Sequence, residues 1–293
     1  MALKRLNVGF ENQTELLQLN LHGCSLNYLS NYTPVTARPD LILANGELKK
    51  QVPMWTVAEK DNAENWKHGD FDYVLNSLGF RDIEINQNSH LELAAFGCSY
   101  TFGVGLPSDK LWHKLLSKKH NLNSYNFGIS GSSIKATCDV FSIISRHMKI
   151  DRAVFLMPSY GRQLCAINKI NNQSIKLCNL LMQQEKDLED YNIQTKSYFK
   201  YTPEPELIRR MKDDIYNLDY LSKLKDIKTF ISSWDRPTYQ MMKLMKFEHI
   251  TLLPEWTSPE DIETNLDLAR DRSHPGINHH KYWADQIEGV VCQ

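Results

Sequence analysis

Three side chains that are far apart in the sequence have the types that nucleophilic hydrolysis needs. Ser99 stands in Gly97-Cys98-Ser99-Tyr100-Thr101-Phe102-Gly103, and His274 and Asp271 stand in Asp271-Arg272-Ser273-His274-Pro275. A serine hydroxyl becomes a good nucleophile when a base removes its proton, and a histidine oriented by a carboxylate is such a base. The spacing therefore predicts Ser99 as nucleophile, His274 as general base and Asp271 as the acid that fixes the tautomer of His274.

A glycine in a second turn fits the same chemistry. Gly131 lies in Asn126-Phe127-Gly128-Ile129-Ser130-Gly131-Ser132-Ser133, directly after an apolar run. Glycine lets the backbone approach a ligand closely, and N–H groups held there stabilise the oxyanion of an attacked carbonyl group. We expect the backbone N–H groups of Ser99 and Gly131 to form an oxyanion hole.

The scaffold that positions these residues is predicted from alternating apolar runs and helical patterns. Ser99 follows the first run, and parallel sheets place their sites at the carboxyl ends of strands. The expected fold is a three-layer α/β/α domain with a mostly parallel, five-stranded sheet. The expected strands are 91–96, 124–129, 153–157, 229–233 and 249–253, and helices are expected at 107–119, from 134 to 148, through 207–218 and over 275–288, with Pro275 first in the last helix.

Two parts of the chain depart from this alternation. Residues 1–85 are predicted to be an irregular N-terminal extension that packs on a catalytic domain formed by residues 86–293. A long insertion is expected at 161–226, with a helical second half. Its first half, 161–200, is either a substrate lid or a surface excursion without a catalytic role.

A second Gly-Cys-Ser tripeptide provides an internal comparison for Ser99. Gly23-Cys24-Ser25 lacks both a preceding apolar strand and a following Thr-x-Gly. We interpret Ser25 as a structural residue, because one serine without a base carries no chemistry.

Together these segments resemble the SGNH/GDSL family of serine hydrolases. Gly97-Cys98-Ser99-Tyr100-Thr101 is similar to the first block of that family, although Cys98 stands where aspartate is usual. Gly131 matches the glycine of the second block, and Asp271-Arg272-Ser273-His274-Pro275 matches the fifth block. The resemblance implies the flavodoxin-like esterase fold, a triad of Ser99, Asp271 and His274, and oxyanion donors at Ser99 and Gly131.

The third block of the family departs from its pattern in this chain. Relatives place an asparagine after the third strand, but here the segment reads Met157-Pro158-Ser159-Tyr160-Gly161-Arg162. The hydroxyl of Ser159 and the guanidinium of Arg162 are the candidates to replace the asparagine as donor.

Composition restricts the partners and the location of the protein. The 293 residues include 34 basic and 35 acidic ones, so the net charge of −1 gives no field for nucleic acid or a membrane surface. The six cysteines lack metal-binding spacing and are expected to be reduced thiols. No signal peptide or membrane span is evident, and we expect a cytoplasmic protein. The sequence does not indicate an oligomeric state.

A metal site at His274, His279 and His280 is disfavoured. Pro275 follows His274, so His274 and His279 do not share one face of a helix. We expect no metal and no cofactor, with His279 and His280 as first-turn surface residues or contacts near the cleft. The tryptophans are expected to pack in the core, with Trp234 as the one to watch near the site.

The reaction expected from these residues is hydrolysis of a small-molecule ester through an acyl-enzyme. A small acyl group, such as an O-acetyl group on a carbohydrate, is expected because no long apolar segment suited to a lipid is evident. Two alternatives stay open: an acyltransferase that uses the same triad, and a non-catalytic binding protein with the same fold.

Overall fold

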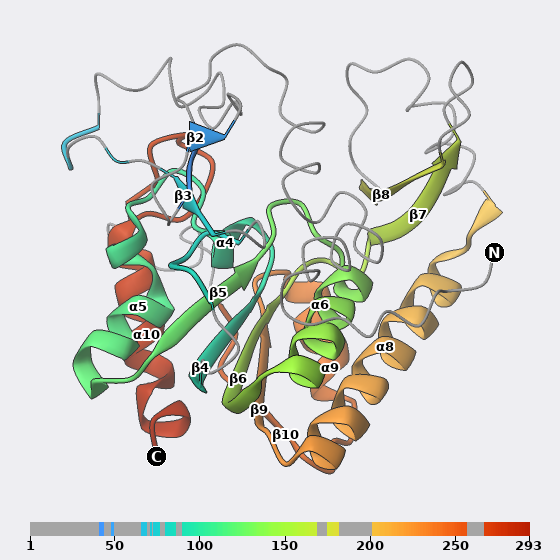
Figure 1. Cartoon of the computed structure of the whole chain (residues 1–293). Coiled ribbons are helices and arrows are strands. Elements are labelled where there is room, and N and C mark those ends of the chain that lie inside the picture. Colours follow the sequence, from blue (N-terminus) through green and yellow to red (C-terminus); the bar gives the residue numbers. More distant parts are fainter. Residues whose placement is uncertain are drawn as a thin grey trace.

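A computed structural model gives the fold of the chain, which Figure 1 shows. The structure describes residues 41–43, 48–49, 66–68, 71, 73–76, 80–85, 90–168, 175–181, 201–256 and 267–293. No helix within these ranges is both long and apolar enough to cross a membrane.

The main sheet has five parallel strands in the order β5-β4-β6-β9-β10. Numbered along the chain, this order is 2-1-3-4-5, which is the flavodoxin-like arrangement. The sequence prediction of a five-stranded, flavodoxin-like parallel sheet is therefore confirmed. The strands are β4 (His90–Gly97), β5 (Ser124–Gly128), β6 (Lys149–Met157), β9 (Lys228–Ser233) and β10 (Ile250–Leu252).

Helices cover both faces of this sheet and complete the three layers (Figure 1). One face packs on α5 (Trp112–His120) and α10 (Ile277–Val291). The other packs on α6 (Ile134–His147), α8 (Glu204–Lys225) and α9 (Arg236–Lys243). Because side chains alternate along a strand, Phe155 of β6 joins the second core while Val154 and Leu156 join the first.

Two helix boundaries differ from the sequence prediction. The helix expected over 107–119 is divided into a 3-10 turn, η3 (Ser108–Lys110), and α5, because Leu111 between them is extended. The last helix begins at Ile277 and not at Pro275. Pro275 instead pairs with Leu268 in an isolated bridge, so the proline closes the loop that carries His274.

The insertion combines a hairpin with a long helix. The strands β7 (Arg162–Asn168) and β8 (Ile175–Leu181) are antiparallel, and α8 follows from Glu204. Leu207, Met211 and Ile215 are buried, as the helical periodicity predicted. Residues 169–174 and 182–200 lie outside the described residues, so a lid over the site stays a prediction.

The described part of the N-terminal region contains a small separate sheet. Its strands are β1 (Leu41–Leu43), β2 (Leu48–Lys49) and β3 (Val74–Leu75), in the order β2-β1-β3. Residues 1–40, which include Ser25, lie outside the described residues. Division of the chain at residue 85 stays a prediction.

Candidate active site

Ser99 occupies the first turn after β4, an interior strand of the sheet. It begins the one-turn helix α4 (Ser99–Phe102), and its side chain is buried at the carboxyl end of the sheet. Its hydroxyl lies 3.9 Å from the Sγ atom of Cys98, and in the described chain it makes no hydrogen bond with His274. As the first residue of a helix, Ser99 has a backbone N–H without an intrahelical acceptor, and no other described residue accepts from it.

His274 and Asp271 form a closed pair in the loop before α10. The Nδ1 atom of His274 lies 2.5 Å from Oδ2 of Asp271, and Oδ1 accepts from the backbone N–H groups of Ser273 and His274 at 3.1 and 3.0 Å. Arg272 adopts a left-handed conformation with φ 55°, which turns the chain back so that one carboxylate meets all three donors. The Asp271 carboxylate therefore occupies Nδ1 and leaves Nε2 for another partner.

The hydrogen bonds also decide the charge of Asp271. Burial by itself raises the pKa of this carboxyl, but the bonds from His274 and Ser273 outweigh burial and lower the pKa below its ordinary value. Asp271 is therefore ionised at neutral pH and can stabilise a protonated His274.

Backbone contacts hold the His274 loop against the turn that follows Ser99. The N–H of Arg270 donates to the carbonyl of Gly105 at 3.0 Å. A Cβ added at Gly105 would lie 2.8 Å from Ala269, so the two loops approach as closely as glycine permits. The ring of His274 lies edge-on to Tyr100, with 5.6 Å between ring centroids. The fold thus brings His274 next to the residue that directly follows Ser99.

Gly131 lies in a turn that is joined to the same strand end. Its φ of 76° is in the left-handed region that favours glycine. The carbonyl of Gly97 accepts from the N–H of Ile129 at 2.9 Å and from the hydroxyl of Ser132 at 3.1 Å, which ties this turn to β4. No acceptor for the N–H of Gly131 is present among the described residues. Two N–H groups without an acceptor among the described residues therefore lie on turns that meet at Gly97, and their role as an oxyanion hole stays a prediction.

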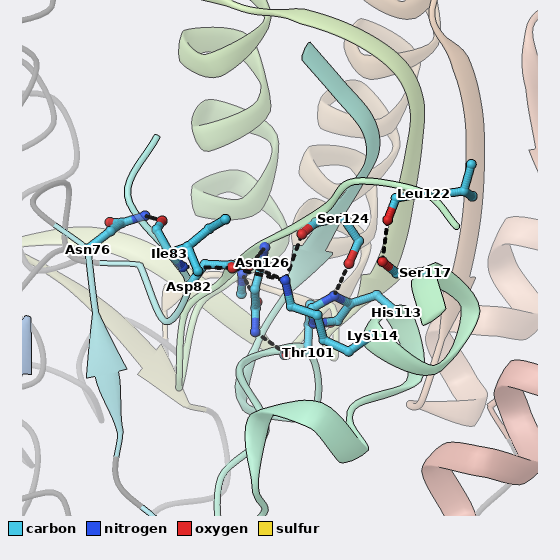
Figure 2. Close-up of polar contacts among 11 residues, drawn as sticks. Asn76, Asp82, Ile83, Thr101, His113, Lys114, Ser117, Leu122, Ser124 and Asn126 are labelled. Carbon is cyan, nitrogen blue, oxygen red and sulfur yellow. Dashed lines mark hydrogen bonds and ion pairs between the residues drawn. The ribbon is translucent and has the colours of Figure 1, made fainter. Parts of the chain in front are cut away.

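Asn126 is a positioning residue that the sequence analysis did not identify (Figure 2). It is fully buried in β5, its Nδ2 donates to the carbonyl of Thr101 at 3.0 Å, and its Oδ1 accepts from the N–H of Gly128 at 2.8 Å. These bonds connect the Ser99 turn to the strand that leads to Gly131. An asparagine between two aromatic residues of this strand, Tyr125 and Phe127, was the available signal.

A second part of the same network holds the outer edge of β5 (Figure 2). The Asp82 carboxylate accepts from the N–H of Asn126 at 2.7 Å and from the N–H of Ile83 at 2.8 Å. Nζ of Lys114 donates to Asp82 at 2.9 Å and to the carbonyl of Ser124 at 2.6 Å. Because β5 is an edge strand, the side chain of Asp82 takes the place of a neighbouring strand for Asn126.

The two residues that could replace the absent asparagine both follow β6. The hydroxyl of Ser159 accepts from the N–H of Gly161 at 3.2 Å, which leaves its own proton available for donation. The guanidinium of Arg162 lies over the ring of Trp234, with Cζ 5.1 Å from the centroid. A role of either residue as an oxyanion donor stays a prediction.

Aromatic side chains enclose the site on the β9 side. The ring of Trp234 is 4.9 Å from that of Tyr100, and its Nε1–H donates to Cys98 Sγ at 3.1 Å. Burial is the main reason that the pKa of the Tyr100 phenol rises to about 12. Tyr100 is therefore a neutral wall of the site and not an acid or base at neutral pH.

The expectation that His279 and His280 are surface residues is wrong. Both are buried, with exposed fractions of 0% and 1%, because the first turn of α10 packs against Trp256. Nδ1 of His280 accepts from the N–H of Trp112 at 3.2 Å, and burial lowers the pKa of His280 to about 3. Among the described residues, no group of histidine, cysteine and acidic side chains could hold a metal ion.

Comparisons with known proteins gave matches among solved structures alone. No family model matches the chain. No curated protein matches it either. A protein assigned to the G-D-S-L family of lipolytic proteins, from Desulfitobacterium hafniense, is 13% identical with a TM-score of 0.44, and the match covers 69% of this chain and 100% of that one.

Two further solved structures are named as esterases. A psychrotrophic esterase from Pseudoalteromonas sp. is 11% identical with a TM-score of 0.40, and the match covers 69% of this chain and 96% of the esterase. An acetyl xylan esterase, AlAXEase, is 13% identical with a TM-score of 0.41, and the match covers 69% of this chain and 100% of that chain. With identities and TM-scores this low, the chemistry proposed below rests on the residues of this chain.

Proposed function

We propose that the protein is a serine ester hydrolase of the SGNH/GDSL type, with Ser99 as nucleophile. The observation that carries this proposal is the Asp271–His274 pair, which is closed at 2.5 Å and docked against the turn that begins at Ser99. An ionised carboxylate on Nδ1 serves to orient an imidazole whose Nε2 takes up and returns a proton.

The reaction then follows from the position of each group. His274 accepts the Ser99 proton as the hydroxyl oxygen attacks the ester carbonyl, and the backbone N–H groups of Ser99 and Gly131 hold the resulting oxyanion. His274 next protonates the leaving alcohol, and the acyl group stays on Ser99. Water then attacks the acyl carbon as His274 takes its proton, the bond to the Ser99 oxygen breaks to release the acid, and His274 returns the proton to Ser99. Ser159 is the candidate for a third donor to the oxyanion.

The free structure holds the Ser99 hydroxyl toward Cys98, so attack requires it to turn toward His274. We infer that the Ser99 side chain rotates about its Cα–Cβ bond, because His274 lies beside Tyr100, the residue that follows Ser99. Catalytic hydrogen bonds are often long in free enzymes and form when substrate binds.

The test is turnover of p-nitrophenyl acetate by a Ser99→Ala variant. We expect kcat to fall by about 10⁴ or more, because removal of the nucleophile of a triad leaves only the contribution of the oxyanion hole and binding. Ser25→Ala is the matched control, since it removes the serine of the other Gly-Cys-Ser tripeptide. Wild-type turnover in Ser99→Ala would disprove the assignment.

An activity probe distinguishes hydrolysis from its alternatives. A fluorophosphonate should label the wild-type protein at Ser99 and should leave Ser99→Ala unlabelled, whereas a binding protein without catalysis would label in neither form. A transferase would label as well, and it is recognised by the acylated alcohol formed when carbohydrate acceptors are added. Faster turnover of p-nitrophenyl acetate than of the decanoate would support a small acyl group.

A further inference from the structure

The guanidinium of Arg162 lies beside the proposed site without a protein acceptor in the described chain. Its Nη1 atom is buried and makes no hydrogen bond to any described residue. The arginine ion pairs found within the described residues are made by Arg209 and Arg210 on α8, and none involves Arg162. A buried charged donor without an acceptor is costly, and a ligand that reaches the half-buried Arg162 would supply the acceptor.

Arg162 is held at this place by an aromatic surface that continues to the nucleophile. Its Cζ lies 5.1 Å from the ring centroid of Trp234, within the range of a cation–π interaction. Trp234 is anchored to Cys98, the neighbour of Ser99, and packs on Tyr100. The strands β4, β6 and β9 are parallel neighbours, so the segments that follow them leave the same edge of the sheet. These segments carry Ser99, Arg162 and Trp234.

Arg162 is connected to the site through one aromatic ring. The ring of Trp234 contacts Arg162 and also contacts Cys98 and Tyr100, the residues on either side of Ser99. We expect a charge held on this ring to meet a part of the substrate beyond the reacting carbonyl. A planar guanidinium offers paired N–H donors whose geometry and charge match a carboxylate.

We propose that Arg162, supported by Trp234, binds a carboxylate group of the substrate, so that the preferred ester is an anion. This inference rests on the proposed hydrolysis at Ser99 and specifies its substrate class. A carboxylate is favoured over a phosphate dianion because one guanidinium supplies one positive charge, and no second described basic side chain shares the surface of Trp234 with Arg162.

The experiment compares esters that differ in charge and little in size. p-Nitrophenyl hydrogen succinate is paired with neutral p-nitrophenyl butyrate, which places the charge on the acyl side. p-Acetoxybenzoate is paired with its neutral methyl ester, which places the charge on the alcohol side. We expect the wild-type kcat/KM to favour the anion in one pair by about tenfold, and the preference to shrink as salt is added.

Substitution of Arg162 assigns the preference to this residue. Arg162→Gln should abolish the preference and change kcat/KM for the neutral ester by less than about threefold, and Arg162→Lys should keep part of the preference. Arg146→Gln, at the exposed end of α6, is the control for net charge and should behave like wild type. If Arg162→Gln folds poorly, the inference is still tested by the wild-type ratio of kcat/KM between anionic and neutral esters and by the salt dependence of that ratio.

Each contrary result has its own meaning. A protein that hydrolyses p-nitrophenyl acetate but prefers neither anion would overturn this inference and leave the hydrolysis intact. Equal losses for neutral and anionic esters in Arg162→Gln would make Arg162 a transition-state donor, which also overturns it. Absence of both fluorophosphonate labelling and ester turnover would remove the proposed function and this inference with it.

Discussion

The two sides of the Ser99 turn differ in how their buried polar groups are satisfied. Toward the edge of β5, the carboxylate of Asp82, the ammonium of Lys114 and the amide of Asn126 all have protein partners. Toward the carboxyl end of the sheet, the N–H groups of Ser99 and Gly131 have no acceptor among the described residues.

The contrast separates the polar groups that hold the fold from the groups to which the proposed function assigns the substrate. A buried polar group without a partner costs about 1–3 kcal/mol, and the chain avoids this cost at β5 with one carboxylate that accepts several donors. The open donors lie where the proposed reaction develops negative charge. Substitutions on the open side should therefore lower mainly the rate, whereas substitutions on the satisfied side should lower mainly the stability of the fold.

The largest effect is expected on the open side, for Asp271→Asn. Asparagine keeps the shape of the side chain but loses the charge that holds the tautomer of His274, so kcat for p-nitrophenyl acetate should fall by about 10⁴. The control is Asp267→Asn, because Asp267 lies in the same loop but accepts from the N–H groups of Ile277 and Asn278. If both variants lose activity equally, the loss reflects the loop and not the Asp271–His274 pair.

The next largest effect is expected on the satisfied side, for Asp82→Ala. Removal of this carboxylate leaves Lys114 and the N–H of Asn126 without their partner, and the loss of one member of a buried pair costs about 3–5 kcal/mol. Urea unfolding should show this cost, while kcat/KM of the folded variant should stay within about threefold of wild type.

An exposed pair provides the control for Asp82. Nζ of Lys110 lies 2.8 Å from Oδ2 of Asp109, but the side chains of Asp109 and Lys110 are 68% and 44% exposed. Asp109→Ala should change the free energy of unfolding by less than about 0.5 kcal/mol. Similar costs for the two aspartates would show that burial and the bond to Asn126 do not distinguish them.

The sequence predicted the groups whose effects are local and failed where distant segments meet. Alternation of apolar runs revealed the parallel sheet, and the three-residue spacing of Asp271 and His274 revealed a pair that closes within one turn. The partners of Asp82 and the burial of His280 depend on segments that are adjacent only in the fold. Such contacts leave no periodic pattern in the sequence, so His280 was expected on the surface or near the cleft.

The smallest effect is expected for His280, the histidine whose burial the sequence did not predict, and it is measured as the pH dependence of stability. Burial lowers the pKa of His280 to about 3, and it also lowers the pKa of His113. The unfolded state, with ordinary values near about 6.5, therefore binds more protons below that pH than the folded state does. Stability from His280 is complete above about pH 6.5 and should decrease by about 2 kcal/mol as the pH falls to about 5.

Two carboxyl groups set the conditions of that measurement. Because the pKa of Asp271 is lowered, its contribution to stability is lost only in more acidic solutions. Burial raises the pKa of Asp214 to about 6, so the folded state takes up a proton at Asp214 and gains stability from it as the pH falls over the same range. The wild-type slope is thus a net value, and His280→Gln isolates one part of it. Urea unfolding at pH 7 and about pH 5 should show less acid sensitivity in this variant, and His68→Gln, at an exposed position, should match wild type. An unchanged slope in His280→Gln would mean that His280 is not held neutral by the core.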